Sequence, residues 1–254
     1  MDENPEIVEA IPQDPPWGFR DLVQVTLFAI LSMLICEAAG LFFLWRWQGG
    51  GRLARSTTEL FSDVRFVLPV QLGAYLLIVA FIYFLIRSRY KRDFWEAIHW
   101  HSVGSRAPLF LMAGVTLAIA ALFVPLLFPA DRPMPIEKLF NGPLAGYLLA
   151  MFGICVAPFV EELLFRGVLY PVLERRWGLE TAVLSTAALF ASIHIQQLNW
   201  AWPQVAAIFL VGMALSYVRG RSGSLVPSYL MHLGYNSTLF VAIFVSSGGF
   251  HHFR

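Results

Sequence analysis

The chain has 254 residues, of which 57% are hydrophobic and 14% are charged, and its formal net charge is +1. Its mean hydropathy of +0.63 and its few charged residues exclude an ordinary soluble domain, in which about a quarter of the residues are charged. A net charge this close to zero gives no reason to expect a nucleic-acid partner. Composition therefore indicates an integral membrane protein.

The N-terminal stretch, residues 1–20, is acidic and rich in proline. Such a segment cannot bury enough apolar surface to fold by itself. It also lacks the basic start that is typical of a cleavable signal peptide. The sequence therefore predicts a disordered acidic tail here.

Apolar runs after this tail predict about seven membrane helices, because about 20 apolar residues are needed to span the hydrocarbon layer. The expected fold is an all-α, polytopic transmembrane helical bundle. It divides into N-terminal membrane helices (21–142), a core (143–246) that is continuous with them as one membrane domain, and a C-terminal tail (247–254). The expected helices are 22–45, 66–86, 107–128, 143–172, 181–195, 204–218 and 225–245.

The distribution of Lys and Arg over the connecting segments predicts the orientation. With a cytoplasmic N-terminus, the inward-facing segments hold Arg20, Arg87, Arg89, Lys91, Arg92, Arg106, Arg166, Arg175, Arg176, Arg219 and Arg221. The outward-facing segments then hold fewer, namely Arg46, Arg52, Arg55, Arg65, Arg132, Lys138 and Arg254. The bias predicts a multi-pass protein of the inner or plasma membrane with its N-terminus in the cytoplasm.

The expected helix 143–172 carries three charged residues in an otherwise apolar stretch, Glu161, Glu162 and Arg166. A charge inside a membrane span costs roughly 2.5–3.5 kcal/mol and indicates function by default. Glu162 and Arg166 are four residues apart, so they share a helix face and can pair. Glu161 is turned by about 100° from Glu162. The pattern predicts a structural ion pair beside one free carboxylate.

Further polar residues occur in the expected fifth and seventh helices. His194 ends the fifth, and His232 and Asn236 share one face of the seventh. Taken singly, each could be a satisfied core residue or an interhelical hydrogen bond. Together with Glu161, however, they lie about 10–20 Å from the cytoplasmic ends of their helices. We therefore expect the four side chains to meet in one layer, which a substrate reaches from the cytoplasmic side.

Three short motifs in this order carry a family resemblance: Glu161-Glu162-x-x-x-Arg166, Phe190-x-x-x-His194 and His232-x-x-x-Asn236. They resemble the signature motifs of the CAAX protease and bacteriocin-processing (CPBP) family, which includes type II CAAX prenyl endopeptidases and abortive-infection proteins. The resemblance covers about residues 143–245. It implies an intramembrane endopeptidase in which Glu161 and His194 activate a water and His232 and Asn236 form an oxyanion hole. Residues implied to be structural at the site are Glu162, Arg166 and Phe190.

These residue types suit peptide hydrolysis, since a carboxylate or an imidazole can take a proton from water, and amide and imidazole N–H groups can stabilise an oxyanion. A metal remains an alternative, because the family is often labelled a metalloprotease. Glu161, His194, His232 and Asn236 could hold a divalent ion such as zinc, with a water at an open position. The sharper zinc signal, H-E-x-x-H, does not occur in the sequence. We favour metal-free chemistry and assign no cofactor.

The expected partners are the lipid bilayer and a peptide or protein substrate, which could be prenylated; nucleic acid is not expected. Two other functions are considered. A non-catalytic membrane scaffold or bacteriocin-immunity protein of the same fold would be favoured by loss of a motif residue, but every motif residue is present. A transporter would favour repeated, broken helices, and the sequence contains no internal repeat.

Overall fold

The computed structural model describes residues 15–48, 50, 56–129 and 135–252. The first fourteen residues of the expected N-terminal tail and the last two residues of the expected C-terminal tail lie outside this part. The described residues form helices and turns, without strands. The predicted all-α class is confirmed.

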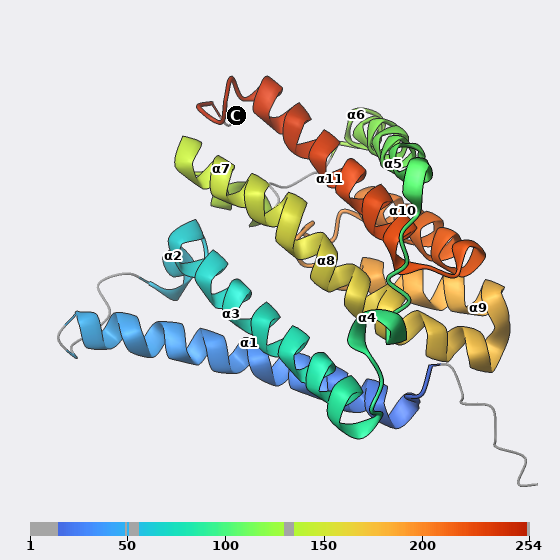
Figure 1. Cartoon of the computed structure of the whole chain (residues 1–254). Coiled ribbons are helices and arrows are strands. Elements are labelled where there is room, and N and C mark those ends of the chain that lie inside the picture. Colours follow the sequence, from blue (N-terminus) through green and yellow to red (C-terminus); the bar gives the residue numbers. More distant parts are fainter. Residues whose placement is uncertain (1–14, 49, 51–55, 130–134, 253–254) are drawn as a thin grey trace, which may run out of the picture.

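The helices follow one another along the whole described chain (Figure 1). The α-helices are α1 (Phe19–Trp47), α2 (Thr57–Leu60), α3 (Val64–Phe84), α4 (Phe94–Ala97), α5 (Ala107–Leu122), α6 (Val124–Leu127), α7 (Pro143–Met151), α8 (Ala157–Glu162), α9 (Tyr170–Ser192), α10 (Trp202–Ser222) and α11 (Leu225–Ser246). The π-helical segments are η1 (Leu85–Arg89), η4 (Phe152–Val156) and η5 (Leu163–Leu169), and the 3₁₀ turns are η2 (Gly104–Arg106) and η3 (Pro135–Leu139).

Six helical runs in the described part are long and apolar enough to cross a membrane. The fourth run contains Gly178, whose φ of 79° and ψ of 172° break the helix. Only glycine adopts such a conformation at no steric cost. The chain folds back there, so the expected fourth and fifth helices are the two arms of this run (Figure 1). The predicted polytopic helical bundle is confirmed. The six runs are Phe19–Trp47, Val64–Arg89, Gly104–Leu127, Pro143–Ser192, Trp202–Ser222 and Leu225–Ser246.

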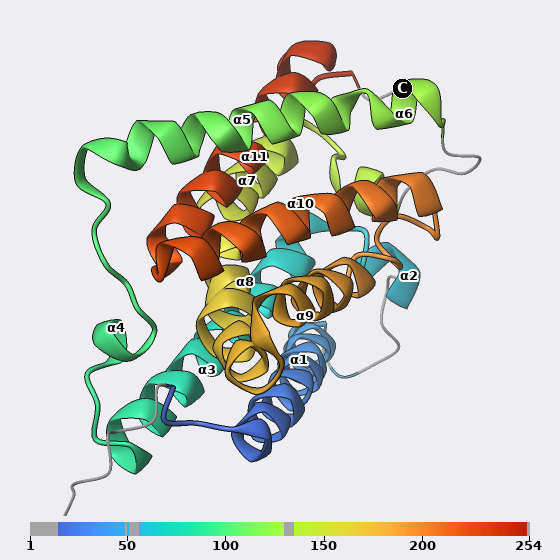
Figure 2. The same ribbon diagram turned by 90° about the vertical axis from the view of Figure 1, so that its right-hand side faces the viewer.

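Helix α11, which carries His232 and Asn236, packs directly on α5 (Figure 2). A Cβ atom at Gly114 would lie 2.0 Å from the carbonyl oxygen of Met231, and one at Gly234 would lie 2.3 Å from that of Leu111. Small residues allow this close approach of backbones, which is how membrane helices commonly associate. The contact fixes the position of α11 in the bundle.

The start of the described chain is packed rather than loose, which corrects the predicted tail for residues 15–20. Trp17 is only 1% exposed, and its indole N–H donates to the Val168 carbonyl oxygen at 3.0 Å. Arg175 donates to the Trp17 carbonyl oxygen at 3.0 Å. The composition of the stretch predicts disorder, but the burial of one tryptophan side chain outweighs it for these residues.

The chain after α11 is packed as well, which corrects the predicted C-terminal tail for residues 247–252. Phe250 is 2% exposed. Its ring lies 5.2 Å from that of Phe244, 5.3 Å from that of Tyr147 and 6.2 Å from that of Phe140, measured between centroids. Figure 1 shows this C-terminal end near the start of α7, at the opposite end of the bundle from the start of α1.

Candidate active site

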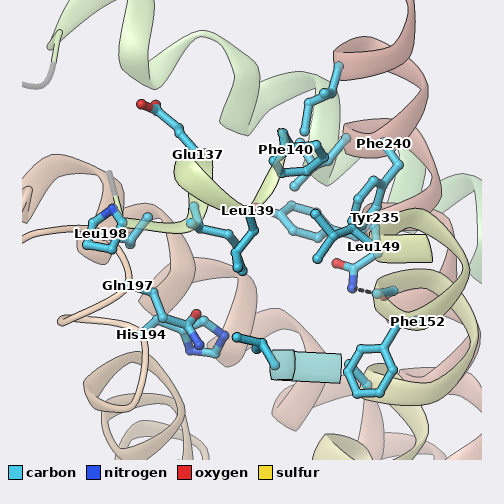
Figure 3. Close-up of a pocket in the computed structure, with 18 of the residues that line it drawn as sticks. Glu137, Leu139, Phe140, Leu149, Phe152, His194, Gln197, Leu198, Tyr235 and Phe240 are labelled. Atoms are coloured by element: carbon cyan, nitrogen blue, oxygen red, sulfur yellow. Dashed lines mark hydrogen bonds between the residues drawn. The ribbon is translucent and has the colours of Figure 1, made fainter. Parts of the chain in front are cut away.

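A cavity of about 1640 Å³ lies among α3, α7, α8, α11 and the segment that follows α9. Its lining includes all four residues predicted to be catalytic: Glu161, His194, His232 and Asn236. Figure 3 shows His194 and Gln197 on one side of the cavity and Leu149, Phe152 and Tyr235 on the other. The structure therefore brings the three sequence motifs to a single chamber.

Helix α8, which carries Glu161 and Glu162, lies between two π-helical segments, η4 and η5. A π-helical turn leaves backbone carbonyls without a normal partner, and such turns are frequent at functional sites. The Asn236 amide donates to the Gly153 carbonyl oxygen in η4 at 2.7 Å. The Trp17 indole donates to the Val168 carbonyl oxygen in η5 at 3.0 Å. These two side chains satisfy carbonyls of the irregular segments on either side of α8.

Glu162 and Arg166 form a fully buried ion pair, in which both side chains are 0% exposed. The guanidinium donates to Glu162 Oε1 at 2.9 Å, to Ser216 Oγ at 3.2 Å and to the Gly212 carbonyl oxygen at 3.0 Å. A buried ion pair is tolerated only when further hydrogen bonds satisfy its groups. Here those bonds join α8 and η5 to α10, the helix that carries Gly212 and Ser216.

The imidazole of His232 lies between the two carboxylates of α8. Its Nδ1 is 3.0 Å from Glu162 Oε1, and its Nε2 is 3.7 Å from Glu161 Oε2. Because Glu162 is an ionised acceptor held by Arg166, the proton on Nδ1 donates to Glu162. The sequence reasoning assigned Glu162 to Arg166 alone, whereas in the structure the same oxygen also orients His232.

His194 lies just beyond the end of α9, in the turn that follows Ser192. Its Nδ1 is 2.8 Å from the carbonyl oxygen of Phe190, one of the last-turn carbonyls that a helix leaves without an intrahelical partner. Since a carbonyl only accepts, Nδ1 carries the proton and Nε2 keeps its lone pair. The end of the helix thus sets both the orientation and the tautomer of His194.

The phenyl ring of Phe190 lies beside the Arg166 guanidinium and both imidazoles. Its centroid lies 4.5 Å from Arg166 Cζ, 4.9 Å from the ring of His194 and 5.8 Å from the ring of His232. An arginine above a ring face is attracted by the ring quadrupole. Phe190 therefore packs against the buried guanidinium and against both imidazoles.

A divalent metal held by these four side chains is the alternative that the sequence leaves open. The described residues contain no group of three or more His, Cys, Asp or Glu side chains placed to hold a metal ion. Three of the four expected ligands make bonds of their own: His194 Nδ1 with the Phe190 carbonyl oxygen, His232 Nδ1 with Glu162, and the Asn236 amide N–H with the Gly153 carbonyl oxygen. These bonds do not involve the Nε2 atoms of the histidines or Asn236 Oδ1. The described residues therefore give no positive indication of a divalent metal site. The metalloprotease expectation gains no support, and no reaction step is derived through a metal.

Two glutamines in the cavity lining, Gln71 and Gln197, were missed by the sequence reasoning. Gln71 lies on α3 and donates to the Tyr75 hydroxyl oxygen at 3.0 Å. A polar residue inside an apolar helix is the signal that could have found it. Glu37, the acidic residue in the middle of α1, does not line this cavity. Among the long N-terminal helices, α3 lines the chamber, with Val67, Leu68 and Gln71, whereas α1 does not.

Comparison with known proteins agrees with the geometry. Residues 143–238 match the family model described as type II CAAX prenyl endopeptidase Rce1-like. Over 126 residues the chain is 35% identical to an "Uncharacterized 24.3 kDa protein" of Escherichia coli, a match that covers 48% of this chain and 56% of that protein. The chain thus spans little more than half the length of this relative.

No solved structure matches the chain. The matched region contains all three motifs that carry the resemblance to the CPBP family, and six apolar helical runs accompany it. The predicted resemblance is confirmed: this is an integral, multi-pass membrane protein whose residues 143–238 match the type II CAAX prenyl endopeptidase Rce1-like family, consistent with the CPBP family.

Proposed function

We propose that the chain is an intramembrane endopeptidase that hydrolyses a peptide bond with a water activated by Glu161 and His194. The observation that carries this proposal is the convergence of Glu161, His194, His232 and Asn236 on one cavity. Polar groups inside membrane spans are expensive, and they collect where they bind or transform something. The family match over residues 143–238 supports peptidase chemistry in the same region.

Two groups are suited to take the proton of the attacking water. The Glu161 side chain is 16% exposed and lies 3.7 Å from His232 Nε2. This separation is too long for a hydrogen bond, so the carboxylate keeps its capacity to accept one from a water. His194 offers the unprotonated Nε2, because Nδ1 is held by the Phe190 carbonyl oxygen. A positioned base of this kind contributes about 10²–10⁴-fold to a rate.

Asn236 and His232 are the proposed oxyanion donors. The Asn236 amide has two N–H groups, and one of them is used on the Gly153 carbonyl oxygen, which leaves the second for the substrate. His232 donates from Nε2 only in its doubly protonated form, in which each ring nitrogen faces a carboxylate. Donors fixed in advance stabilise developing charge without reorganisation.

Water is the only reactant besides the peptide in the proposed reaction. The water oxygen attacks the peptide carbonyl carbon while its proton passes to Glu161 or His194. The carbonyl oxygen becomes an oxyanion, which Asn236 and His232 stabilise. When the C–N bond breaks, the proton passes to the leaving nitrogen, so the products are a carboxylic acid and an amine, which become a carboxylate and an ammonium once the acid gives up its proton to the amine.

The proposed substrate is a peptide or protein in or at the membrane. The family description names prenyl endopeptidases, so a lipidated substrate is one form that this proposal includes. Apolar side chains line the cavity beyond the four polar residues, among them Leu139, Phe140, Leu149, Leu239 and Phe240. Such walls suit apolar residues on either side of the cleaved bond, and they suit an isoprenoid chain equally well.

The test compares protein termini in membranes of cells that express the wild type, Glu161→Gln or Glu37→Gln. Glu37→Gln is the matched control, since it makes the same chemical change in a membrane helix away from the cavity. New termini should appear with the wild type and with Glu37→Gln and be absent with Glu161→Gln. Equal cleavage by Glu161→Gln, at equal protein abundance, would sink the proposed role of Glu161.

A further inference from the structure

The cavity reaches the surface at one end of the bundle. The four proposed catalytic residues lie on α8, α11 and the turn after α9, whereas much of the remaining lining comes from η3, from residues 197–198 and from the chain after α11. Several side chains in these segments are exposed, including Ile136, Glu137, Gln197 and His251. We call this end of the bundle, bounded by residues 135–140, 197–198 and 247–252, the mouth.

The mouth has a defined rim. Phe250 is 2% exposed and packs against Phe140 and Phe244. A Cβ atom at Gly146 would lie 2.3 Å from Phe250 Cγ, so the ring fits tightly against the start of α7. The amide of His252 donates to the Ser247 carbonyl oxygen at 2.9 Å. The segment after α11 is therefore a packed part of the cavity wall.

The other end of the bundle is filled. Trp17, Ile86, Ile98, Leu163 and Leu225 belong to one hydrophobic cluster there, and each is 1% exposed or less. Close-packed clusters of this kind leave no room for a chain to pass. We call the part of the bundle around this cluster the closed end.

Hydrogen bonds between neighbouring segments secure the closed end. The Leu225 amide donates to the His99 carbonyl oxygen at 2.9 Å. The Ser224 hydroxyl donates to the His101 carbonyl oxygen at 3.0 Å. These bonds tie the loop before α5 to the start of α11, so access from this side would require both segments to separate. The sequence reasoning expected the substrate to arrive from this end, and the cavity instead extends away from it.

The two ends differ in basic residues. At the closed end the described residues include Arg20, Arg87, Arg89, Lys91, Arg92, Arg106, Arg175, Arg176 and Arg221. At the mouth end they include Arg46, Arg65 and Lys138. With Arg52, Arg55, Arg132 and Arg254, which lie outside the described residues, the sequence counts seven basic residues for the segments of this side, against nine for the closed end. Basic residues in short loops favour the cytoplasmic side. The closed end is accordingly assigned to the cytoplasm.

We infer that the cavity takes its substrate from the side of the membrane away from the cytoplasm, as an apolar peptide segment that enters at the mouth. This inference rests on the proposed function, because it assumes that the cavity binds a peptidase substrate. It deepens that function, because it selects extracytoplasmic or exported peptide segments over cytoplasmic C-terminal tails. The apolar wall between the mouth and the polar residues, which includes Leu139, Leu149 and Phe240, is the part that would contact such a segment.

Thiol labelling from each side of the membrane tests this inference. In a Cys36→Ser, Cys155→Ser background, single cysteines are introduced at the rim (Gln197→Cys), on the cavity wall (Gln71→Cys) and at the closed end (Ser88→Cys). A membrane-impermeant maleimide is applied to sealed right-side-out and inside-out vesicles. We expect Gln197→Cys and Gln71→Cys to react only in right-side-out vesicles, and Ser88→Cys only in inside-out vesicles. His251→Cys, also exposed at the rim, replaces Gln197→Cys if that variant does not fold.

Two results would overturn the inference. Labelling of Gln71→Cys together with Ser88→Cys in inside-out vesicles would show that the cavity is reached from the cytoplasm. Labelling of the rim in inside-out vesicles and of Ser88→Cys in right-side-out vesicles would show that the orientation is reversed. The labelling needs no catalysis and should be unchanged in Glu161→Gln, so its failure is distinct from failure of the proposed peptidase activity.

Discussion

The buried pair of Glu162 and Arg166 yields the sharpest prediction about stability. Replacing Arg166 by Met leaves an ionised Glu162 that is 0% exposed, and it removes the donors that serve Ser216 Oγ and the Gly212 carbonyl oxygen. Breaking one side of a buried pair costs about 3–5 kcal/mol of unfolding free energy. Glu162→Leu should cost a similar amount, because the guanidinium then stays buried without its carboxylate.

The double variant should cost much less than the sum of the two single variants. An apolar pair of similar volume leaves no buried charge, which is often close to neutral. Some loss remains, because His232 Nδ1 loses its acceptor, at about 1–3 kcal/mol. The two single costs add to about 6–10 kcal/mol, so a double variant that loses about 1–3 kcal/mol implies a coupling energy of about 3 kcal/mol or more, at or above the upper end of the usual range for residues in one network.

The assay for this cycle is reversible unfolding of the purified protein in mixed detergent micelles, with the wild type and the three variants measured side by side. If the two sites were independent, the loss of unfolding free energy in the double variant would equal the sum of the two single losses to within about 0.5 kcal/mol. Additivity would therefore refute the claim that the two side chains stabilise the bundle as a pair.

Three further predictions follow from single contacts. Gly234→Ala should lower stability by about 1–3 kcal/mol, measured by unfolding in detergent, because its Cβ would lie 2.3 Å from the Leu111 carbonyl oxygen; an unchanged stability would contradict the close contact of α5 and α11. Trp17→Phe should cost about 1–3 kcal/mol in the same assay, because the Val168 carbonyl oxygen loses its donor, and a neutral result would count against this anchor. Asn236→Ala should lower kcat about 10²–10³-fold in a peptide-cleavage assay, and an unchanged kcat would remove it from the oxyanion hole.

The membrane helices and the polar cluster could be predicted from the sequence because their signals are local. Apolar runs mark the spans, and the four-residue spacing of Glu162 and Arg166 gives their pairing directly. The family match begins at Pro143, where the core was expected to begin. The bond between His232 and Glu162 could not be predicted, because it joins residues 70 positions apart, and helix periodicity carries no information about which helices become neighbours.

The π-helical segments and the direction of the cavity also required the structure. Apart from Arg166 and one glycine in each, η4 and η5 consist of apolar residues that an α-helix also accepts. One carbonyl of each segment is satisfied by a distant side chain, Asn236 or Trp17. Depth along each helix placed the four polar residues in one layer, but it gave no indication of which end is filled. That difference arises from long-range packing, such as Leu225 against Ile98 at one end and Phe250 against Phe140 at the other.

The central claim is that Glu161 activates the attacking water, and a cleavage assay on purified protein tests it most directly. Wild type, Glu161→Gln and Glu37→Gln are reconstituted in liposomes and given a peptide that spans a cleavage site found in the terminal profile. The account predicts that Glu161→Gln loses about 10²–10⁴-fold in kcat, while Glu37→Gln cleaves at the wild-type rate. Cleavage at the wild-type rate by a folded Glu161→Gln variant would contradict the account.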